Sequence, residues 1–243
     1  MIEFKDVRVT YENKRKEKTV AVNDFSLNIN DGEIIVILGA SGSGKTSIIK
    51  ALAGLIPYDN GNIFLNGNDI LSFSIKDRNM SFASQQTTLY SMFDVYHNIA
   101  IPLRSQHVPY DEIDKRVKEI ASKLDISFLL SRKPFQLSEG QKQKVNLARC
   151  MIKKPSILLL DEPFANLDKE NKMNMHFLIK EIHKSYNPTI IFVTHDVHEA
   201  MFLADRVVIM DNGKIIQVGT PKEITNSHDK IVSDLLKAGG IDL

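Results

Sequence analysis

Residues 39–46, which read GASGSGKT, constrain the fold of this chain more than any other stretch. The apolar run at 34–38 precedes them and predicts a buried strand, and the breaker-free run at 47–53 predicts a helix. In a strand–turn–helix context, glycines let successive backbone N–H groups surround a phosphate at the helix N-terminus. The pattern therefore predicts a P-loop, in which Lys45 reaches the β- and γ-phosphates and Thr46 holds Mg²⁺.

A P-loop identifies a nucleoside triphosphate and does not distinguish a kinase, a GTPase, a recombinase or a transport motor, so the rest of the chain must decide. A chain of 243 residues has room for one domain with a subdomain and for a substantial core. A formal net charge of +1 provides no field that would gather nucleic acid. The single cysteine, Cys150, excludes a disulfide framework and a cysteine metal site.

The order of the strand and helix patterns predicts the fold class. Residues 2–11 and 19–29 have the pattern of two paired strands, with a half-buried alternation in the second. Buried strands at 157–160 and 189–193 alternate with helical segments, which is typical of a mostly parallel sheet. We therefore predict an α/β fold of the P-loop NTPase class, with an N-terminal antiparallel β subdomain beside a mostly parallel core sheet.

The composition changes to helical between residues 94 and 151, where apolar residues recur at helical spacing. This segment is predicted to be an inserted α-helical subdomain. Residues 1–243 would then form a single domain, in which 1–93 and 152–243 make up the core with its β subdomain.

Three predicted strands end in residues that suit phosphate chemistry. Asp161 ends an apolar strand, where a carboxylate is costly to bury unless it is paired, and hydrated Mg²⁺ is a natural partner. Glu162 follows and would face the other way if the strand continued, in a position to act as general base on an attacking water. His195 ends another strand and is a candidate contact for the γ-phosphate. In parallel sheets, ligands bind at the carboxyl ends of the strands. We therefore expect the residues that follow these three strands to converge on one site.

At this point the residues resemble the ATP-binding cassette subunit of ABC transporters over the full length of the chain. Residues 39–46 match the P-loop of that family, and Gln85 matches its Q-loop glutamine. Residues 137–141 (LSEGQ) are similar to its signature motif, 160–163 (LDEP) match its magnesium aspartate and catalytic glutamate, and 165–168 (ANLD) match its D-loop. His195 matches the switch histidine, and Tyr11 stands where the family has an aromatic residue that stacks on adenine.

The resemblance implies a site that uses ATP and Mg²⁺. The catalytic residues would be Lys45, Gln85, Glu162 and His195, and the magnesium ligands Thr46, Gln85 and Asp161. The nucleotide-binding residues would be Tyr11, Gly39, Ala40, Ser41, Gly42, Ser43, Gly44, Lys45, Thr46, Ser47, Ser138, Gly140, Gln141 and Asp168.

The family also implies partners. Its cassettes form head-to-tail dimers that sandwich two ATP molecules, so Ser138 and Gly140 would serve the γ-phosphate bound by the other copy. The second copy would be an identical or a related cassette. Integral membrane permease subunits and an extracytoplasmic solute-binding protein are the other expected partners, and no nucleic acid is expected.

One residue departs from the commonest signature motif of the family, because Glu139 stands where glycine is usual. A carboxylate about 4 Å from a phosphate charge would cost roughly 4 kcal/mol at an effective dielectric constant of 20. The same carboxylate gains only about 0.3–1 kcal/mol from the dipole of the helix N-terminus. We therefore predict that Glu139 turns outward and that the site still works.

The branch of the family follows from smaller features. A cassette without a membrane-spanning part is commoner in importers, and the runs at 98–104 and 194–200 resemble importers of sugars, polyamines or compatible solutes. The start of the chain is not a signal peptide, and no apolar run is long enough to span a bilayer. The expected location is therefore cytoplasmic, on the inner face of the membrane through the permease. The alternatives are a cassette ATPase of an exporter or of a non-transport process such as DNA repair or ribosome function, and a P-loop phosphotransferase.

Overall fold

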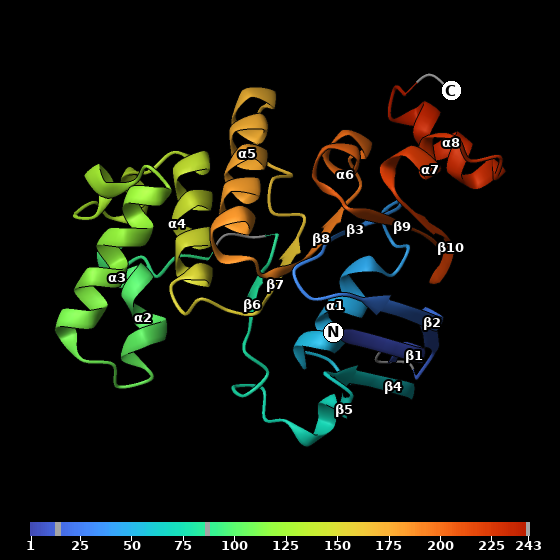
Figure 1. Ribbon diagram of the computed structural model, residues 1–243, viewed down its shortest axis with the longest axis horizontal. Coiled ribbons are helices and arrows are strands. Elements are labelled where there is room, and N and C mark those ends of the chain that lie inside the picture. The colour runs from blue at the N-terminus through green and yellow to red at the C-terminus, as the bar shows by residue number, and fades with distance from the viewer. Residues whose placement is uncertain (13–15, 86–87, 242–243) are drawn as a thin grey trace. The chain divides into compact units, whose positions relative to one another are not determined.

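The computed structural model of the protein describes residues 1–12, 16–85 and 88–241, and it divides the chain into two compact units (Figure 1). The first unit contains Met1–Met80 and Thr189–Leu243, and the second contains Ser81–Pro188. The helical segment expected at 94–151 lies within the second unit, and its boundaries as a subdomain stay a prediction. No helix in the described ranges is long and apolar enough to cross a membrane.

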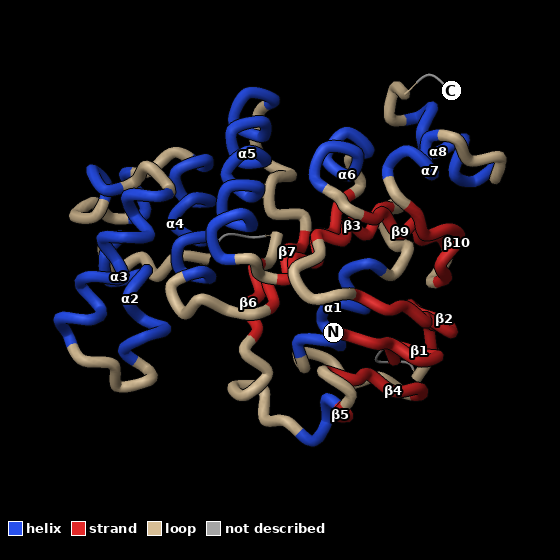
Figure 2. The backbone as a smooth tube through the Cα atoms, viewed as in Figure 1, coloured by secondary structure: helices blue, strands red, loops and turns tan. Residues whose placement is uncertain are grey.

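The first unit contains an antiparallel sheet with the strand order β2-β1-β4-β5 (Figure 2). Its long hairpin pairs Ile2 with Ile29 at one end and Glu12 with Lys18 at the other, as the alternation of apolar and polar residues predicted. One face of the hairpin is buried, and Phe4 packs edge to face on Phe25 at 5.2 Å. The strands are β1 (Ile2–Glu12), β2 (Lys18–Ile29), β4 (Asn60–Leu65) and β5 (Asn68–Asp69).

The first unit also contains four strands of a second sheet, in the order β10-β9-β3-β8. Strand β3 runs parallel to both β8 and β9, and β9 and β10 form an antiparallel hairpin with Asn212 and Gly213 in its turn. Both turn residues have positive φ, which suits a tight hairpin turn. The strands are β3 (Ile34–Leu38), β8 (Thr189–Thr194), β9 (Arg206–Asp211) and β10 (Lys214–Gly219).

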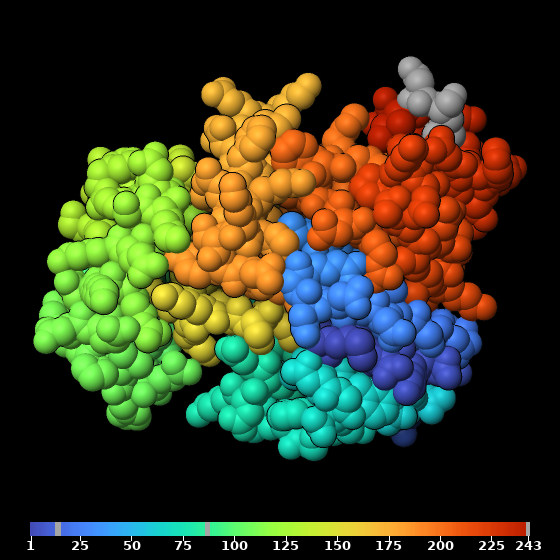
Figure 3. All heavy atoms as spheres, viewed as in Figure 1, coloured from blue at the N-terminus to red at the C-terminus, as the bar shows by residue number. Residues whose placement is uncertain are grey.

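Helix α1 (Lys45–Ala53) is buried along most of its length and contacts β1 and β2 of one sheet and β8 of the other. Helix α6 (Val197–Leu203) contacts β3 and β8. The two short C-terminal helices lie beside β10, where they form part of the surface (Figure 3). They are α7 (Pro221–Thr225) and α8 (Lys230–Ala238), and a 3₁₀ turn, η1, covers Ile70–Ser72.

The second unit is mostly helical, with the neighbouring strands β6 (Met80–Ala83) and β7 (Ile157–Asp161). Strand β6 begins one residue before this unit, and β7 is buried throughout. The helices are α2 (Val95–Arg104), α3 (Tyr110–Lys123), α4 (Glu139–Met151) and α5 (Lys169–Tyr186), with 3₁₀ turns η2 (Ser127–Leu129) and η3 (Pro134–Gln136). The predicted fold class, α/β with an antiparallel and a mostly parallel sheet, is confirmed.

Candidate nucleotide site

The P-loop lies between β3 and α1, and close backbone packing explains its glycines. Gly44 has a φ of 99°, in the left-handed region that favours glycine. A Cβ atom at Gly44 would lie 2.2 Å from the carbonyl oxygen of Ala21 on β2. A Cβ atom at Gly39 would lie equally close, 2.2 Å, to the carbonyl oxygen of Met210 on β9. The loop is therefore held against the main chain of two strands, where no side chain fits.

Lys45 closes this loop from the first position of α1. Its side chain is buried, and Nζ donates hydrogen bonds of 2.8 Å to the carbonyl oxygens of both Gly39 and Ala40. The hydroxyl of Ser43 is buried and has no hydrogen-bond partner in the described part of the chain. Buried polar atoms are nearly always hydrogen-bonded, so this hydroxyl, two residues before the buried lysine, is notable. A phosphate oxygen is an acceptor that fits this donor set.

The open side of the loop is formed by Ser41 and Gly42, which are both exposed. A Cβ atom at Gly42 would find no other atom within 4 Å, in contrast to the crowded Gly44. Thr46 is half-buried and Ser47 is buried, both in the first turn of α1. The first N–H groups of a helix lack intrahelical partners, so this turn presents donors to an anion.

Tyr11 lies beside this turn of α1. Its hydroxyl is 3.1 Å from the Ser47 hydroxyl, although the two residues belong to different elements. The Tyr11 side chain remains 44% exposed, so its ring has an open surface. The hydrogen bond therefore fixes an accessible aromatic ring close to the helix N-terminus that follows the P-loop.

His195 follows the last residue of β8. Leu38 pairs with Thr194 in the parallel ladder, so the strand tips that lead to Gly39 and to His195 lie at the same edge of the sheet. The His195 side chain is exposed there. Asp196 caps α6 by accepting from the backbone N–H groups of His198 and Glu199.

Asp161 and Glu162 belong to the second unit and adopt different backbone conformations. Asp161 is the buried last residue of β7, with 5% of its surface exposed. Glu162 is half-buried and has a φ of 44°, an uncommon conformation for a non-glycine residue that often marks functional sites. Strand geometry therefore stops at Asp161, and the alternation that would turn Glu162 to the opposite face does not apply. A turn begins instead, closed by the hydrogen bond from the Ala165 N–H to the Glu162 carbonyl oxygen at 3.3 Å.

The signature segment forms the N-terminus of α4. Ser138 is the N-cap and forms a capping box with Gln141, in which each side chain accepts the other residue's backbone N–H. The helix begins at Glu139. The exposed Glu139 carboxylate is 3.2 Å from Lys142 Nζ on the next turn. Its charge is thus paired along the surface of its own helix.

The signature segment and the D-loop lie close together in the second unit. Asp168 is the N-cap of α5, and both of its carboxylate oxygens accept hydrogen bonds from Asn171, at 2.9 and 2.6 Å. These bonds hold the pKa of Asp168 below its usual range. The Asn171 side chain is also the nearest neighbour of Gly140, since a Cβ there would lie 3.4 Å from Asn171 Oδ1. Asn171 therefore connects two motifs that are distant in sequence.

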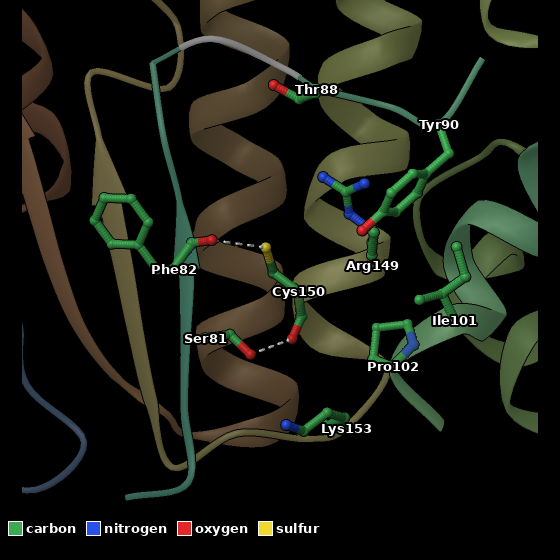
Figure 4. A pocket seen from close by; sticks show the side chains of 9 residues that line it. All are labelled: Ser81, Phe82, Thr88, Tyr90, Ile101, Pro102, Arg149, Cys150 and Lys153. Carbon is green, nitrogen blue, oxygen red and sulfur yellow. Dashed lines mark hydrogen bonds between the residues drawn. The ribbon is translucent and has the colours of Figure 1, made fainter. Parts of the chain in front are cut away.

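A cavity of about 440 Å³ lies entirely within the second unit (Figure 4). Tyr90, Ile101, Pro102 and Arg149 contribute to its wall, and the guanidinium of Arg149 lies 5.7 Å from the centre of the Tyr90 ring. Cys150 also lines it, and burial raises the pKa of this thiol to about 11, as suits a packing role. The predicted residue Gln85 is exposed just after β6 and does not line this cavity.

Tyr90 and Arg149 were not among the residues singled out from the sequence. Their pairing joins positions 59 apart in the chain, which no local pattern reveals. Asn98 supports Tyr90, because its buried side chain accepts from the Tyr90 N–H at 2.8 Å and donates to the Tyr90 carbonyl at 3.1 Å. The only signal in the sequence was the run at 98–104, which contains Asn98, Ile101 and Pro102.

Comparison with known proteins places these motifs in a family. A sequence profile described as ABC transporter matches residues 22–165, which is more than half of the chain. The chain is 39% identical over 224 residues to a spermidine/putrescine import ATP-binding protein, PotA, of Haemophilus influenzae, covering 92% of this chain and 59% of that protein. It is 44% identical over 206 residues to a sulfate/thiosulfate import ATP-binding protein, CysA 2, of Agrobacterium fabrum, covering 84% and 60%.

The chain thus spans about three fifths of the length of these relatives. Among solved structures, the ATP-binding cassette MJ0796, in a dimeric post-hydrolysis state bound to ADP and Pi, matches with a TM-score of 0.82 and 27% identity. That match covers 91% of this chain and 99% of the other. The sequence profile, the relatives and the fold agree, and the chain belongs to the ABC transporter family.

Proposed function

We propose that this chain is an ATP-hydrolysing subunit that powers an ABC importer. The observation that supports this most directly is the P-loop of the first unit, where a buried lysine stands at a helix N-terminus and a buried hydroxyl has no partner among the described residues. The relatives named above are import ATP-binding proteins, one for polyamines and one for sulfate or thiosulfate. The solute proposed here is accordingly a small organic solute, as the sequence suggested, or an inorganic anion.

In this proposal the first unit binds the nucleotide. Residues 39–47 surround the phosphates with backbone N–H groups, and Lys45 exchanges its carbonyl partners for phosphate oxygens. Tyr11 stacks on the adenine, for which its accessible ring beside Ser47 is suited. His195 contacts the γ-phosphate from the neighbouring strand tip.

The second unit supplies the chemistry. Glu162 takes a proton from the water that attacks the γ-phosphorus, and ADP leaves with the electrons of the broken P–O bond. Thr46, Gln85 and Asp161 are the proposed magnesium ligands, a set of oxygen donors that suits a hard cation. A Mg²⁺ ion held by these residues would offset the negative charge that develops on the phosphate oxygens. The buried position of Asp161 and the strained backbone of Glu162 support functional roles for both.

Each site is proposed to be completed by a second cassette. Ser138, Gly140 and Gln141 would approach the γ-phosphate of the partner copy, and Asp168 would lie at the same interface. The capping box and the Asn171 bonds support this role, because they hold both motifs in a fixed arrangement within one unit. The ATP-binding cassette MJ0796 is itself dimeric. The second cassette is either an identical chain or a related one.

A membrane permease is the proposed partner at the cavity of Figure 4, whose wall combines an aromatic ring, aliphatic side chains and a guanidinium. Met92 and Phe93 add exposed apolar surface to the loop that follows Tyr90. Such a surface suits an amphipathic helix presented by an integral membrane subunit. The chain would thereby act on the cytoplasmic face of the membrane, and a solute-binding protein would deliver the solute from outside.

The test is ATP turnover by the purified chain, measured with Mg²⁺ over a range of protein concentrations. Turnover that rises more steeply than protein concentration, together with an ATP-dependent dimer in light scattering, is the expected result. Magnesium-dependent ATP turnover that stays strictly proportional to protein concentration would contradict the two-cassette site. Isolation of the native complex from membranes should then recover an integral membrane subunit, and its absence would contradict the transport role.

A further inference from the structure

A second cavity in the first unit lies at the C-terminal end of α1, away from the P-loop. It has a volume of about 440 Å³ and is lined in part by Gly54, Leu55, Ile56, Tyr58, Leu71 and Arg78. None of these residues belongs to the P-loop, which begins the same helix. With nine residues at about 1.5 Å per residue, α1 separates its two ends by roughly 13 Å.

Arg78 is the charged group of this cavity, and it is almost completely buried, with 6% of its surface exposed. Its Nη1 donates a hydrogen bond of 3.0 Å to the carbonyl oxygen of Leu52, in the last turn of α1. Gly54 makes room for this contact, since a Cβ there would lie 2.6 Å from Nη1. One N–H group of the guanidinium therefore completes the end of a helix, which is a structural role.

Another donor of the guanidinium, Nε, is buried and has no hydrogen-bond partner among the described residues. No carboxylate in that part of the chain forms an ion pair with Arg78. The nearby acids are engaged elsewhere: Asp69 accepts from the Leu71 N–H at 2.8 Å, and Asp77 accepts from the Ser74 hydroxyl. A buried guanidinium without an anionic partner is costly, and Nε together with Nη2 forms the side-on fork that matches a carboxylate.

The remaining wall is mostly apolar. Leu55 and Leu71 are 55% and 67% exposed at the rim, and Ile56 and Ile70 extend the surface inward. The Tyr58 hydroxyl is also buried, and it has no hydrogen-bond partner of ordinary geometry among the described residues, so the wall carries a second polar group. We propose that this cavity binds a small aliphatic monocarboxylate, with its carboxylate on the Arg78 fork and its chain against the leucine and isoleucine side chains. Charge complementarity and the apolar wall together select this class over inorganic anions.

The experiment is calorimetric titration of the full chain with butyrate, hexanoate, hexanol and inorganic phosphate. Hexanoate should bind with 1:1 stoichiometry, and about tenfold or more tighter than hexanol, since a charge-assisted bidentate pair exceeds one power of ten. Hexanoate should bind tighter than butyrate by roughly fourfold for each added methylene that becomes buried. Inorganic phosphate that binds as tightly as hexanoate would overturn the apolar part of the proposal.

Variants complete the test. R78Q and R78K should both lose hexanoate affinity by about tenfold or more, because neither amide nor ammonium reproduces the fork. R132Q, at an exposed arginine of the second unit, is the matched control and should bind like the wild type. Because Arg78 also supports α1, L71D provides a variant at the exposed rim that should repel the carboxylate without disturbing the fold. Binding that survives in R78Q and L71D, or the absence of saturable binding to the wild type, would overturn the proposal.

Discussion

The two units support their motifs in different ways. In the first unit, close backbone packing supports the P-loop, because Gly39 and Gly44 lie against strand carbonyls that leave no room for a side chain. In the second unit, side-chain hydrogen bonds at helix N-termini hold the motifs, as between Ser138 and Gln141 and between Asp168 and Asn171. A site built from backbone contacts tolerates few substitutions. A capped helix end is instead weakened gradually, because each substitution removes only one or two hydrogen bonds. The contrast predicts which variants remove binding, which remove chemistry and which only weaken the fold.

The largest expected effect separates binding from chemistry. E162Q keeps the shape of the side chain but removes the proposed base, so ATP hydrolysis should fall by roughly 10²–10⁴ while ATP still binds. K45A, in the first unit, should instead lose ATP binding, because the buried ammonium group of Lys45 is the main positive charge of the P-loop. Fluorescent-nucleotide binding and phosphate release measure the two properties. Undiminished turnover in E162Q would remove Glu162 from the mechanism.

A pair of glycine variants tests the contrast on stability. G44A should lose about 1–3 kcal/mol of unfolding free energy from backbone strain alone, and more from the clash with the Ala21 carbonyl. G140A should stay within about 0.5 kcal/mol of the wild type, because its Cβ would meet only the Asn171 side chain, no closer than 3.4 Å. Urea unfolding monitored by circular dichroism measures both. Equal losses in the two variants would show that the units do not differ in this way.

The contrast between contiguous motifs and contacts made by tertiary packing also explains which features could be predicted from the sequence. The P-loop was predictable because its strand, glycines and helix are contiguous, and the same holds for the β9–β10 turn at Asn212 and for the cap at Ser138. The conformation of Glu162 was not predictable, because a strand pattern says nothing of where the chain turns after the last buried residue. Contacts between distant segments, such as that of Arg149 with Tyr90 or of Gly140 with Asn171, depend on tertiary packing, and no periodicity reports them.

A smaller effect is expected at Tyr11, where the first unit uses a side chain rather than backbone. Y11A should weaken ATP binding by about tenfold, since stacking of an aromatic ring on a base is worth roughly 1–3 kcal/mol. Y11F should stay close to the wild type, because it keeps the ring and loses only the contact with the Ser47 hydroxyl. Y110A, which removes a 65% exposed tyrosine of the second unit, is the control. Equal ATP affinity in Y11A and the wild type would exclude the adenine contact.

Glu139 should matter less again, because its carboxylate is paired with Lys142 on an exposed helix surface. Such i,i+3 pairs contribute about 0.2–0.5 kcal/mol, so E139G should change ATPase activity and dimer formation by less than about tenfold. Steady-state turnover and ATP-dependent dimer formation provide the measurement, with K142M as the companion variant that leaves the carboxylate unpaired. A hundredfold gain in E139G would mean that the glutamate opposes the nucleotide after all.

The smallest effect is a pH dependence in the second unit. The pKa of Asp168 lies below its usual range because the Asn171 backbone and side-chain N–H groups donate to the carboxylate. A carboxyl group whose pKa is depressed in the folded state stabilises that state at pH values above its unfolded pKa of about 3.9, and the contribution disappears as the pH falls through the folded value. D168A should therefore have a lower Tm than the wild type at pH 7, and the difference should shrink below about pH 4. D229A, which removes the N-cap of α8 in the first unit, is the matched control for the loss of a cap. A Tm difference for D168A that is constant from pH 7 to pH 3 would show that the carboxylate charge does not hold the D-loop.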